Sequence, residues 1–109
     1  MSEQMLKFVN MSRRTPEKRP ALPRIRDFNE IFDTFEPEPA AEQASRCSQC
    51  GIPYCQVHCP VHNHVPDWLK LTVEGRMEEA YELSSRTNNL PEVCGRICPQ
   101  DRLCEGNCV

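Results

Sequence analysis

The chain has 109 residues, enough for one small domain, and its single tryptophan and ten prolines leave little material for a packed hydrophobic core. A net charge of −3 and a basic run, residues 13–26, without any aromatic side chain argue against a nucleic-acid-binding surface. No stretch approaches the ~20 apolar residues that cross a bilayer, so membrane insertion is not expected either.

The amino-terminal residues contain no apolar core of a secretion signal, which predicts a cytoplasmic protein. Disulfides are rare in that reducing compartment, where clustered cysteines more often bind metal. The eight cysteines of the chain are therefore predicted to be metal ligands rather than four disulfides.

Residues 1–26 are predicted to be an extended arm without regular structure, because Pro16, Pro20 and Pro23 fix the backbone and remove hydrogen-bond donors. Two interpretations remain open for this arm: a flexible, solvated tail, or a docking arm that becomes ordered on a partner. Residues 27–109 are predicted to form the folded domain.

Two helices are predicted before the first cysteine. Apolar residues recur at near-helical spacing in residues 28–35, which predicts a short amphipathic helix. Pro37 and Pro39 interrupt that pattern, and residues 40–46 then favour a helix that leads directly into Cys47.

Three further helices are predicted, in residues 66–73, 77–86 and 91–98. Gly75 suits the end of the first of these, and Pro99 ends the last. The positions of residues 77–86 predicted to lie in the core are Met77, Ala80, Tyr81 and Ser84. No segment alternates between apolar and polar residues, so we expect an all-α domain with an antiparallel helix pair between two cysteine-rich ends.

All eight cysteines lie in two runs of four, each with a proline directly after one cysteine, a pattern typical of two 4Fe-4S clusters. In bacterial ferredoxins the cysteine before the proline binds the other cluster, which predicts an exchange of ligands between the runs. The predicted ligands of the first cluster are Cys47, Cys50, Cys55 and Cys108. Those of the second cluster are Cys59, Cys94, Cys98 and Cys104.

Zinc is the alternative occupant, because Cys47 and Cys50 have the spacing of a zinc knuckle and His58, His62 and His64 follow nearby. The other gaps between cysteines do not form a second pair of that spacing, which favours clusters over zinc. The histidines are interpreted as polar surface groups, since eight cysteines already satisfy two clusters.

Two longer motifs contain these runs: Arg46-Cys-x2-Cys-Gly-x-Pro-Tyr-Cys-x3-Cys-Pro-Val-His-Asn and Asn89-Leu-Pro-Glu-Val-Cys-Gly-Arg-Ile-Cys-Pro-Gln-Asp-Arg-Leu-Cys-Glu-Gly. From about Arg24 to Val109 the sequence resembles the N-terminal iron–sulfur domain of the small (beta) subunit of bacterial NADPH-dependent glutamate synthase. The same domain type occurs in dihydropyrimidine dehydrogenase and in other flavin oxidoreductases.

The resemblance implies an α-helical ferredoxin-like fold with two 4Fe-4S clusters. These would carry electrons from NADPH, through the FAD of the small subunit, to the FMN of the large (alpha) subunit, where L-glutamate is made. The family's small subunit continues into FAD- and NADPH-binding domains that this sequence does not contain, so we expect a domain that is not catalytic alone. For the fourth ligand of the second cluster, the resemblance leaves Cys94 or a side chain beyond Val109.

Overall fold

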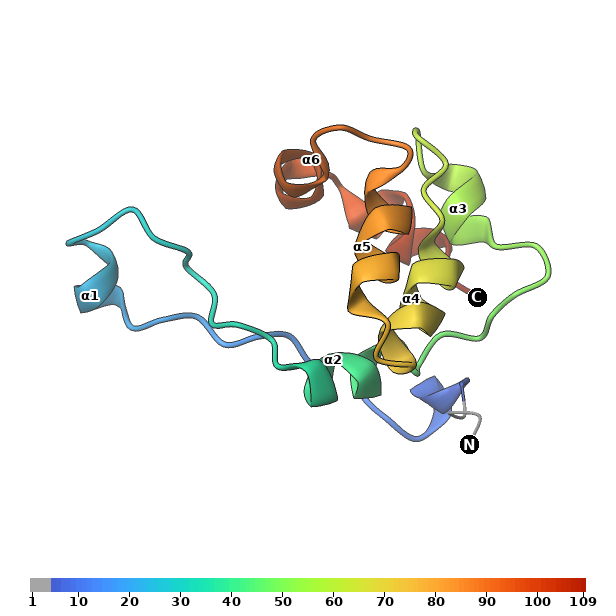
Figure 1. The fold of residues 1–109 in the computed structure, drawn as a ribbon, viewed down its shortest axis with the longest axis horizontal. Helices are drawn as coiled ribbons and strands as arrows, with labels where there is room; N and C mark the ends of the chain where they lie inside the picture. Colours follow the sequence, from blue (N-terminus) through green and yellow to red (C-terminus); the bar gives the residue numbers. More distant parts are fainter. Residues whose placement is uncertain (1–4) are drawn as a thin grey trace.

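The computed structural model describes residues 5–109, so residues 1–4 of the predicted arm lie outside it. Within the described residues the fold is all-α, as predicted, with no strand and one isolated antiparallel bridge between Lys18 and Phe32 (Figure 1). The α-helices are α1 (Ala21–Arg24), α2 (Pro37–Ala44), α3 (Tyr54–His58), α4 (Val65–Val73), α5 (Met77–Ser85) and α6 (Pro91–Ile97). The 3-10 helices are η1 (Lys7–Val9), η2 (Gln100–Arg102) and η3 (Glu105–Asn107).

Helices α4 and α5 form the predicted antiparallel pair and lie side by side in the body of the molecule (Figure 1). Gly75 ends α4 at φ 77°, a left-handed conformation that glycine adopts without strain. The N–H of Gly75 donates to the carbonyl of Thr72 at 3.1 Å, and the N–H of Arg76 donates to that of Leu71 at 2.9 Å. These two bonds form a Schellman motif, which satisfies the last carbonyls of α4 and turns the chain into α5.

The core is small. Among the described residues, the buried apolar side chains are Ala44, Pro66, Val73 and Ala80, and Ser45 is buried with them. Asn63 supplements this packing: its amide accepts a hydrogen bond from the Trp68 indole at 2.8 Å and donates to the Ser84 carbonyl at 2.7 Å. Helix α2 packs across α4 and closes one end of the pair. The packing therefore positions the two cysteine runs with little buried apolar surface of its own.

The helix predicted in residues 28–35 is absent from the structure. The Asp27 carboxylate accepts a hydrogen bond from the N–H of Asn29 at 3.0 Å, and the Glu30 carboxylate accepts one from the N–H of Ile31 at 2.9 Å. Such local side-chain bonds compete with helical ones for the same backbone donors. Phe32 then forms the bridge with Lys18, so an irregular but hydrogen-bonded segment replaces the helix.

The prediction for the next helix is wrong at its start, because α2 begins at Pro37 rather than after the prolines. The first four N–H groups of a helix have no partner within it. The missing N–H groups of Pro37 and Pro39 therefore remove no hydrogen bond from the first turn. The helix ends at Ala44, and Cys47 follows after one turn in which its N–H donates to the Ala44 carbonyl at 3.2 Å.

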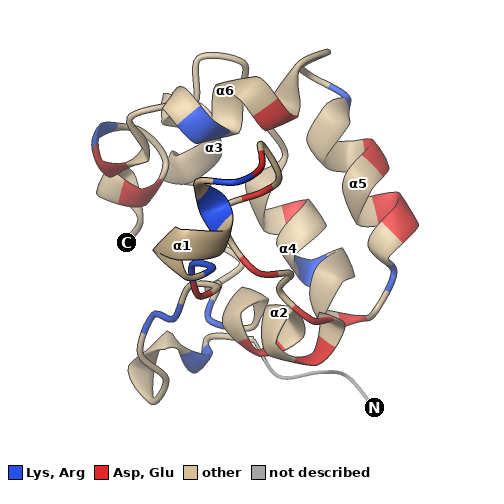
Figure 2. Ribbon diagram, turned by 90° about the vertical axis from the view of Figure 1, so that its left-hand side faces the viewer, with Lys and Arg blue, Asp and Glu red and all other residues tan. Residues whose placement is uncertain are grey.

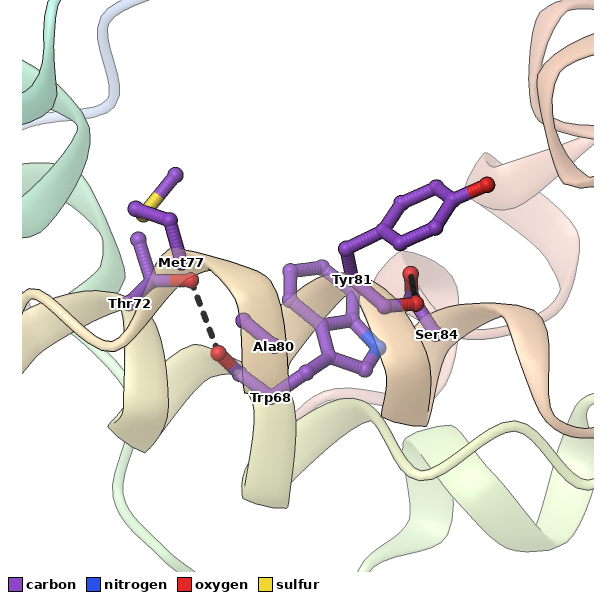
Figure 3. A pocket seen from close by; sticks show the side chains of 6 residues that line it. All are labelled: Trp68, Thr72, Met77, Ala80, Tyr81 and Ser84. Atoms are coloured by element: carbon purple, nitrogen blue, oxygen red, sulfur yellow. Dashed lines mark hydrogen bonds between the residues drawn. The ribbon is translucent and has the colours of Figure 1, made fainter.

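Helices α5 and α6 occupy almost the predicted residues, but the predicted core of α5 is only partly correct. Ala80 is buried, whereas Met77 is 46% exposed and Tyr81 is 68% exposed. These two side chains lie along a shallow depression above Trp68, on a face of the helix pair that no other described element covers (Figure 3). Helical periodicity identified the face of α5 that is apolar, and the small domain buries only its inner edge.

The arm is more ordered than predicted, since it contains η1 and α1. Its first described residues lie against the end of α2, where the N–H of Lys7 donates to the Ser45 carbonyl at 2.9 Å and that of Leu6 to the Cys47 carbonyl at 2.8 Å. The N–H of Arg19 donates to the Ile31 carbonyl at 2.7 Å, which closes residues 17–33 into a loop, named here the arm loop. This loop, with α1 within it, projects from the helical body (Figure 1).

Candidate metal centre

The first cysteine run folds into a loop followed by the short helix α3, which was not predicted. Pro53 precedes this helix, and Cys55 lies in its first turn. Cys59 ends α3 in an extended conformation, φ −69° and ψ 126°, and Pro60 then prevents continuation of the helix. The run therefore has two parts, a loop that carries Cys47 and Cys50 and a helix that carries Cys55 and Cys59.

The second run begins on α6, which Pro91 opens, as predicted for that residue. Cys94 lies within the helix, and the N–H of Cys98 donates to the Cys94 carbonyl at 2.9 Å where the helix ends. Two 3-10 helices follow, with Cys104 directly before η3 and Cys108 directly after it. A series of tight helical turns thus determines where the four cysteines of the second run lie in space.

Helices η2 and η3 approach each other closely at Gly106. A Cβ placed on Gly106 would overlap the carbonyl oxygen of Asp101 and lie 2.7 Å from its carbonyl carbon. Only glycine permits this approach. Gly106 therefore keeps η3, and with it Cys104 and Cys108, against the preceding turn.

Cysteines from the two runs meet at α3, which lies against η3. Burial raises the pKa of the Cys55 thiol, the N–H of Gln56 partly offsets this, and the nearby thiols of Cys47 and Cys108 raise the pKa further. The packing of α3 against η3 places the helix that carries Cys55 beside the turn bordered by Cys104 and Cys108. Which of these thiols share a cluster stays a prediction.

Cys98 ends α6, and Cys104 follows directly before η3. Burial raises the pKa of the Cys104 thiol, with smaller effects from the N–H and carboxylate of Glu105 and from the Cys98 thiol. The assignment of Cys98 and Cys104 to the second cluster stays a prediction. Cys59 ends α3, and Cys94 is exposed on α6.

The donor set fits iron–sulfur clusters. All eight thiols are free, six are half-buried, and Cys94 and Cys108 are exposed. In residues 5–109, no three His, Cys, Asp or Glu side chains are gathered around one point as a single metal ion requires. A 4Fe-4S cluster binds each thiolate through a different iron, so its ligands stand further apart than those of one ion. The assignment of each cysteine to a cluster stays a prediction.

Gln49 is a polar contact of the site that the sequence did not indicate. Its side-chain amide nitrogen lies 3.3 Å from the Cys47 sulfur and 2.8 Å from the Pro66 carbonyl oxygen, and its backbone nitrogen lies 3.4 Å from the same sulfur. Gln49 adopts φ 52°, which is uncommon for a residue with a side chain. Only the fold places it between the first cysteine and the start of α4.

The three histidines contact polar groups of α3, α4 and the loop between them, in keeping with their interpretation as polar surface groups. The His58 ring lies 3.0 Å from the Tyr54 carbonyl, and the His62 ring lies 3.3 Å from the Gln56 carbonyl. The His64 ring lies 4.0 Å from the Asp67 carboxylate.

The arm loop is joined to the second cysteine run by an ion pair. Arg96, on α6 between Cys94 and Cys98, donates to the Glu30 carboxylate, with one N–O distance of 3.0 Å. The hydrogen bond from Arg96, supported by the N–H of Phe32, lowers the pKa of Glu30 to about 2. Because folding lowers the pKa of this carboxyl group, the ion pair stabilises the fold at pH values above the ordinary carboxyl pKa. This contribution is lost only as the pH falls below about 4.

Lys and Arg residues occur along the arm and around α1 together with Asp and Glu residues, and several acidic residues lie on α5 (Figure 2). No helix in the described part of the chain is both long and apolar enough to span a membrane.

Comparisons with known proteins agree with the chemistry of this site. Residues 24–109 match the family model described as dihydropyrimidine dehydrogenase domain II, 4Fe-4S cluster. The chain is 68% identical, over 108 residues, to the glutamate synthase (NADPH) small chain of Azospirillum brasilense, a match that covers 99% of this chain and 22% of that protein. The protein of the same name from Escherichia coli strain K12 is 55% identical over 109 residues, with coverage of 100% and 23%.

A relative with another name matches as well. The putative oxidoreductase AegA of Escherichia coli strain K12 is 47% identical over 99 residues, which are 90% of this chain and 15% of that protein. This chain therefore spans about a fifth, or less, of the length of the curated relatives that it matches.

Proposed function

This chain belongs to the family of dihydropyrimidine dehydrogenase domain II, 4Fe-4S cluster, and we propose that it is the electron-transfer domain of a glutamate synthase small subunit. In this proposal it receives electrons that come from NADPH through FAD in the remainder of the subunit. It passes them to the FMN of the large subunit for the synthesis of L-glutamate. When bound, two 4Fe-4S clusters carry these electrons one at a time.

The observation that carries this proposal is the packing of α3 against η3. Helix α3 carries Cys55 of the first run, and Cys104 and Cys108 of the second run border η3, so two segments far apart in the sequence lie together. Crossed ligation of this kind holds two clusters close together. In the proposed arrangement Cys47, Cys50, Cys55 and Cys108 hold one cluster, and the remaining four cysteines hold the other.

We predict that anaerobically purified protein is brown and contains about eight irons and eight sulfides per chain. Metal and sulfide analysis checks the composition, and electron paramagnetic resonance after reduction with dithionite checks the cluster type. A colourless protein that carries zinc instead would contradict the proposal. A content of about four irons per chain would indicate that only one cluster forms, and the second run would then not have its proposed role.

A second candidate is the iron–sulfur domain of another flavin oxidoreductase, which the 47% identity to AegA favours. The higher identities, 68% and 55%, are to glutamate synthase small chains, and this difference supports the first candidate. The two differ in what the assembled enzyme does with electrons from NADPH. NADPH oxidation that depends on glutamine and 2-oxoglutarate distinguishes a glutamate synthase from the alternative.

The proposed partner is the large subunit, and the proposed docking element is the tip of the arm loop. There Phe28 is fully exposed, and Leu22 and Ile25 are 73% and 77% exposed. Arg24 and Arg26 flank these apolar side chains. Because Glu30 joins this loop to Arg96, a partner bound at the tip would lie on a segment that is anchored beside the second cysteine run.

We predict that the double substitution Ile25→Ser and Phe28→Ser weakens binding to the large subunit by about tenfold or more, since burial of one such side chain contributes about 1.5–3 kcal/mol. Iron content should not change, because neither side chain packs in the core. Tyr81→Ser, at an exposed aromatic position on α5 outside the arm loop, is the control. Titration calorimetry that finds unchanged affinity for the double variant, or a loss for Tyr81→Ser alone, would contradict docking through the arm loop.

A further inference from the structure

Gln49 lies between Cys47 and Cys50 in the loop of the first cysteine run. Both its backbone N–H and its side-chain amide face the sulfur of Cys47, at N–S distances of 3.4 Å and 3.3 Å. In residues 5–109, it is the one side chain that donates a hydrogen bond to a cysteine sulfur. Nothing in the cysteine spacing requires a glutamine at this position.

The second contact of the Gln49 amide fixes its direction. An amide nitrogen carries two hydrogens, and here one is directed to the Pro66 carbonyl at 2.8 Å and the other to the sulfur. Pro66 is buried in the first turn of α4, so the carbonyl is held by the helix pair. The positive φ of Gln49 has an energetic cost, which the surrounding contacts must offset.

We propose that Gln49 raises the reduction potential of the cluster bound by Cys47. The inference rests on the proposed function, in which Cys47 is a ligand of the first cluster. A one-electron reduction adds negative charge that is shared with the thiolate sulfurs, and no proton transfer is needed. The amide hydrogen of Gln49 stabilises that added charge, because hydrogen bonds to sulfur favour the more negative state of an iron–sulfur site.

The test is the substitution Gln49→Met in the loaded chain, which keeps a side chain of similar length and removes the donor. At the wild-type midpoint the ratio of reduced to oxidised first cluster should fall on the order of fivefold, the effect of one net hydrogen bond. For a one-electron couple that is a shift of about 40 mV to lower potential. A redox titration followed by electron paramagnetic resonance measures the shift, and the midpoint of the second cluster should stay unchanged.

Gln43→Met is the matched control, because the Gln43 side chain bonds only to Arg14 and Ser12, and no cysteine sulfur is among its partners. Neither midpoint should change in this variant. If Gln49→Met leaves both midpoints at their wild-type values while both clusters are present, the inference is overturned. An equal shift of both midpoints would also overturn it, since that indicates a general structural change rather than a local hydrogen bond.

A measurement on the unsubstituted chain covers the case in which Gln49→Met does not retain its first cluster. Cell-free synthesis with glutamine labelled with ¹⁵N at the side-chain amide allows pulsed electron paramagnetic resonance to detect a nitrogen close to the reduced cluster. A coupled ¹⁵N signal is expected, and its absence overturns the inference. Loss of the proposed function has a different signature, a protein without iron, whereas failure of this inference leaves iron and sulfide content intact.

Discussion

Removal of iron from the loaded chain with a chelator is expected to abolish its cooperative thermal unfolding. In residues 5–109 the buried apolar side chains are Ala44, Pro66, Val73 and Ala80, all of them small. Such a core contributes too little to offset the conformational entropy of the chain. Under the proposed ligand assignment, metal bound by thiols from both runs would supply the missing stability, because metal binding in small domains is coupled to folding.

Circular dichroism during heating checks this prediction. The loaded chain should unfold in one sigmoidal transition, and the iron-free chain should show a gradual change without a midpoint. Anaerobic reconstitution with iron and sulfide is the control, since it should restore the transition. An iron-free chain that unfolds cooperatively at the same temperature would show that packing alone holds the domain together.

The substitution Gly106→Ala is expected to destabilise the loaded domain by about 3 kcal/mol, the upper end of the usual cost of overpacking. The added methyl group would overlap the Asp101 carbonyl, which is backbone and cannot move aside as a flexible side chain would. Relief of this overlap requires η2 and η3 to separate. Cys104 and Cys108 border η3, so iron content should fall together with stability.

Gly95→Ala is the matched control for this substitution. Gly95 lies within α6, and apart from its chain neighbours and the backbone of its own helix, a Cβ placed there would meet no atom within 4 Å. Replacing a helical glycine by alanine usually stabilises by about 0.5–1 kcal/mol. Denaturant unfolding of the two variants should therefore give changes of opposite sign. Equal stability of Gly106→Ala and the unsubstituted chain would show that the Asp101–Gly106 approach is not a fixed part of the fold.

Helical periodicity predicted α4 and α5 well because those helices pack against each other and carry their own end signals. Gly75 ends α4, as expected, through the Schellman motif. The same periodicity failed in residues 28–35, where Phe28 is fully exposed, Ile31 and Phe32 are partly exposed, and Asp27 and Glu30 bind the backbone instead. Spacing thus identifies a helix reliably when its apolar face has something to pack on.

The candidate site was predictable in its chemistry and less so in its surroundings. Cysteine spacing and the position of the prolines indicated clusters, and the family match agrees with this. The sequence indicated neither Gln49, whose direction depends on the buried Pro66 carbonyl, nor the ion pair of Arg96 with Glu30. Contacts of this kind depend on tertiary distances between segments that have no common motif.

The packing of α3 against η3 also has a consequence for biosynthesis. A ribosome makes α3 long before it makes η3, so under the proposed ligand assignment a nascent chain exposes an incomplete set of thiols for most of its synthesis. The first cluster can be completed only after Cys108 has left the exit tunnel. Completion of the first cluster would thereby require that both cysteine runs have been translated, and a chain interrupted within α6 would lack one ligand of that cluster.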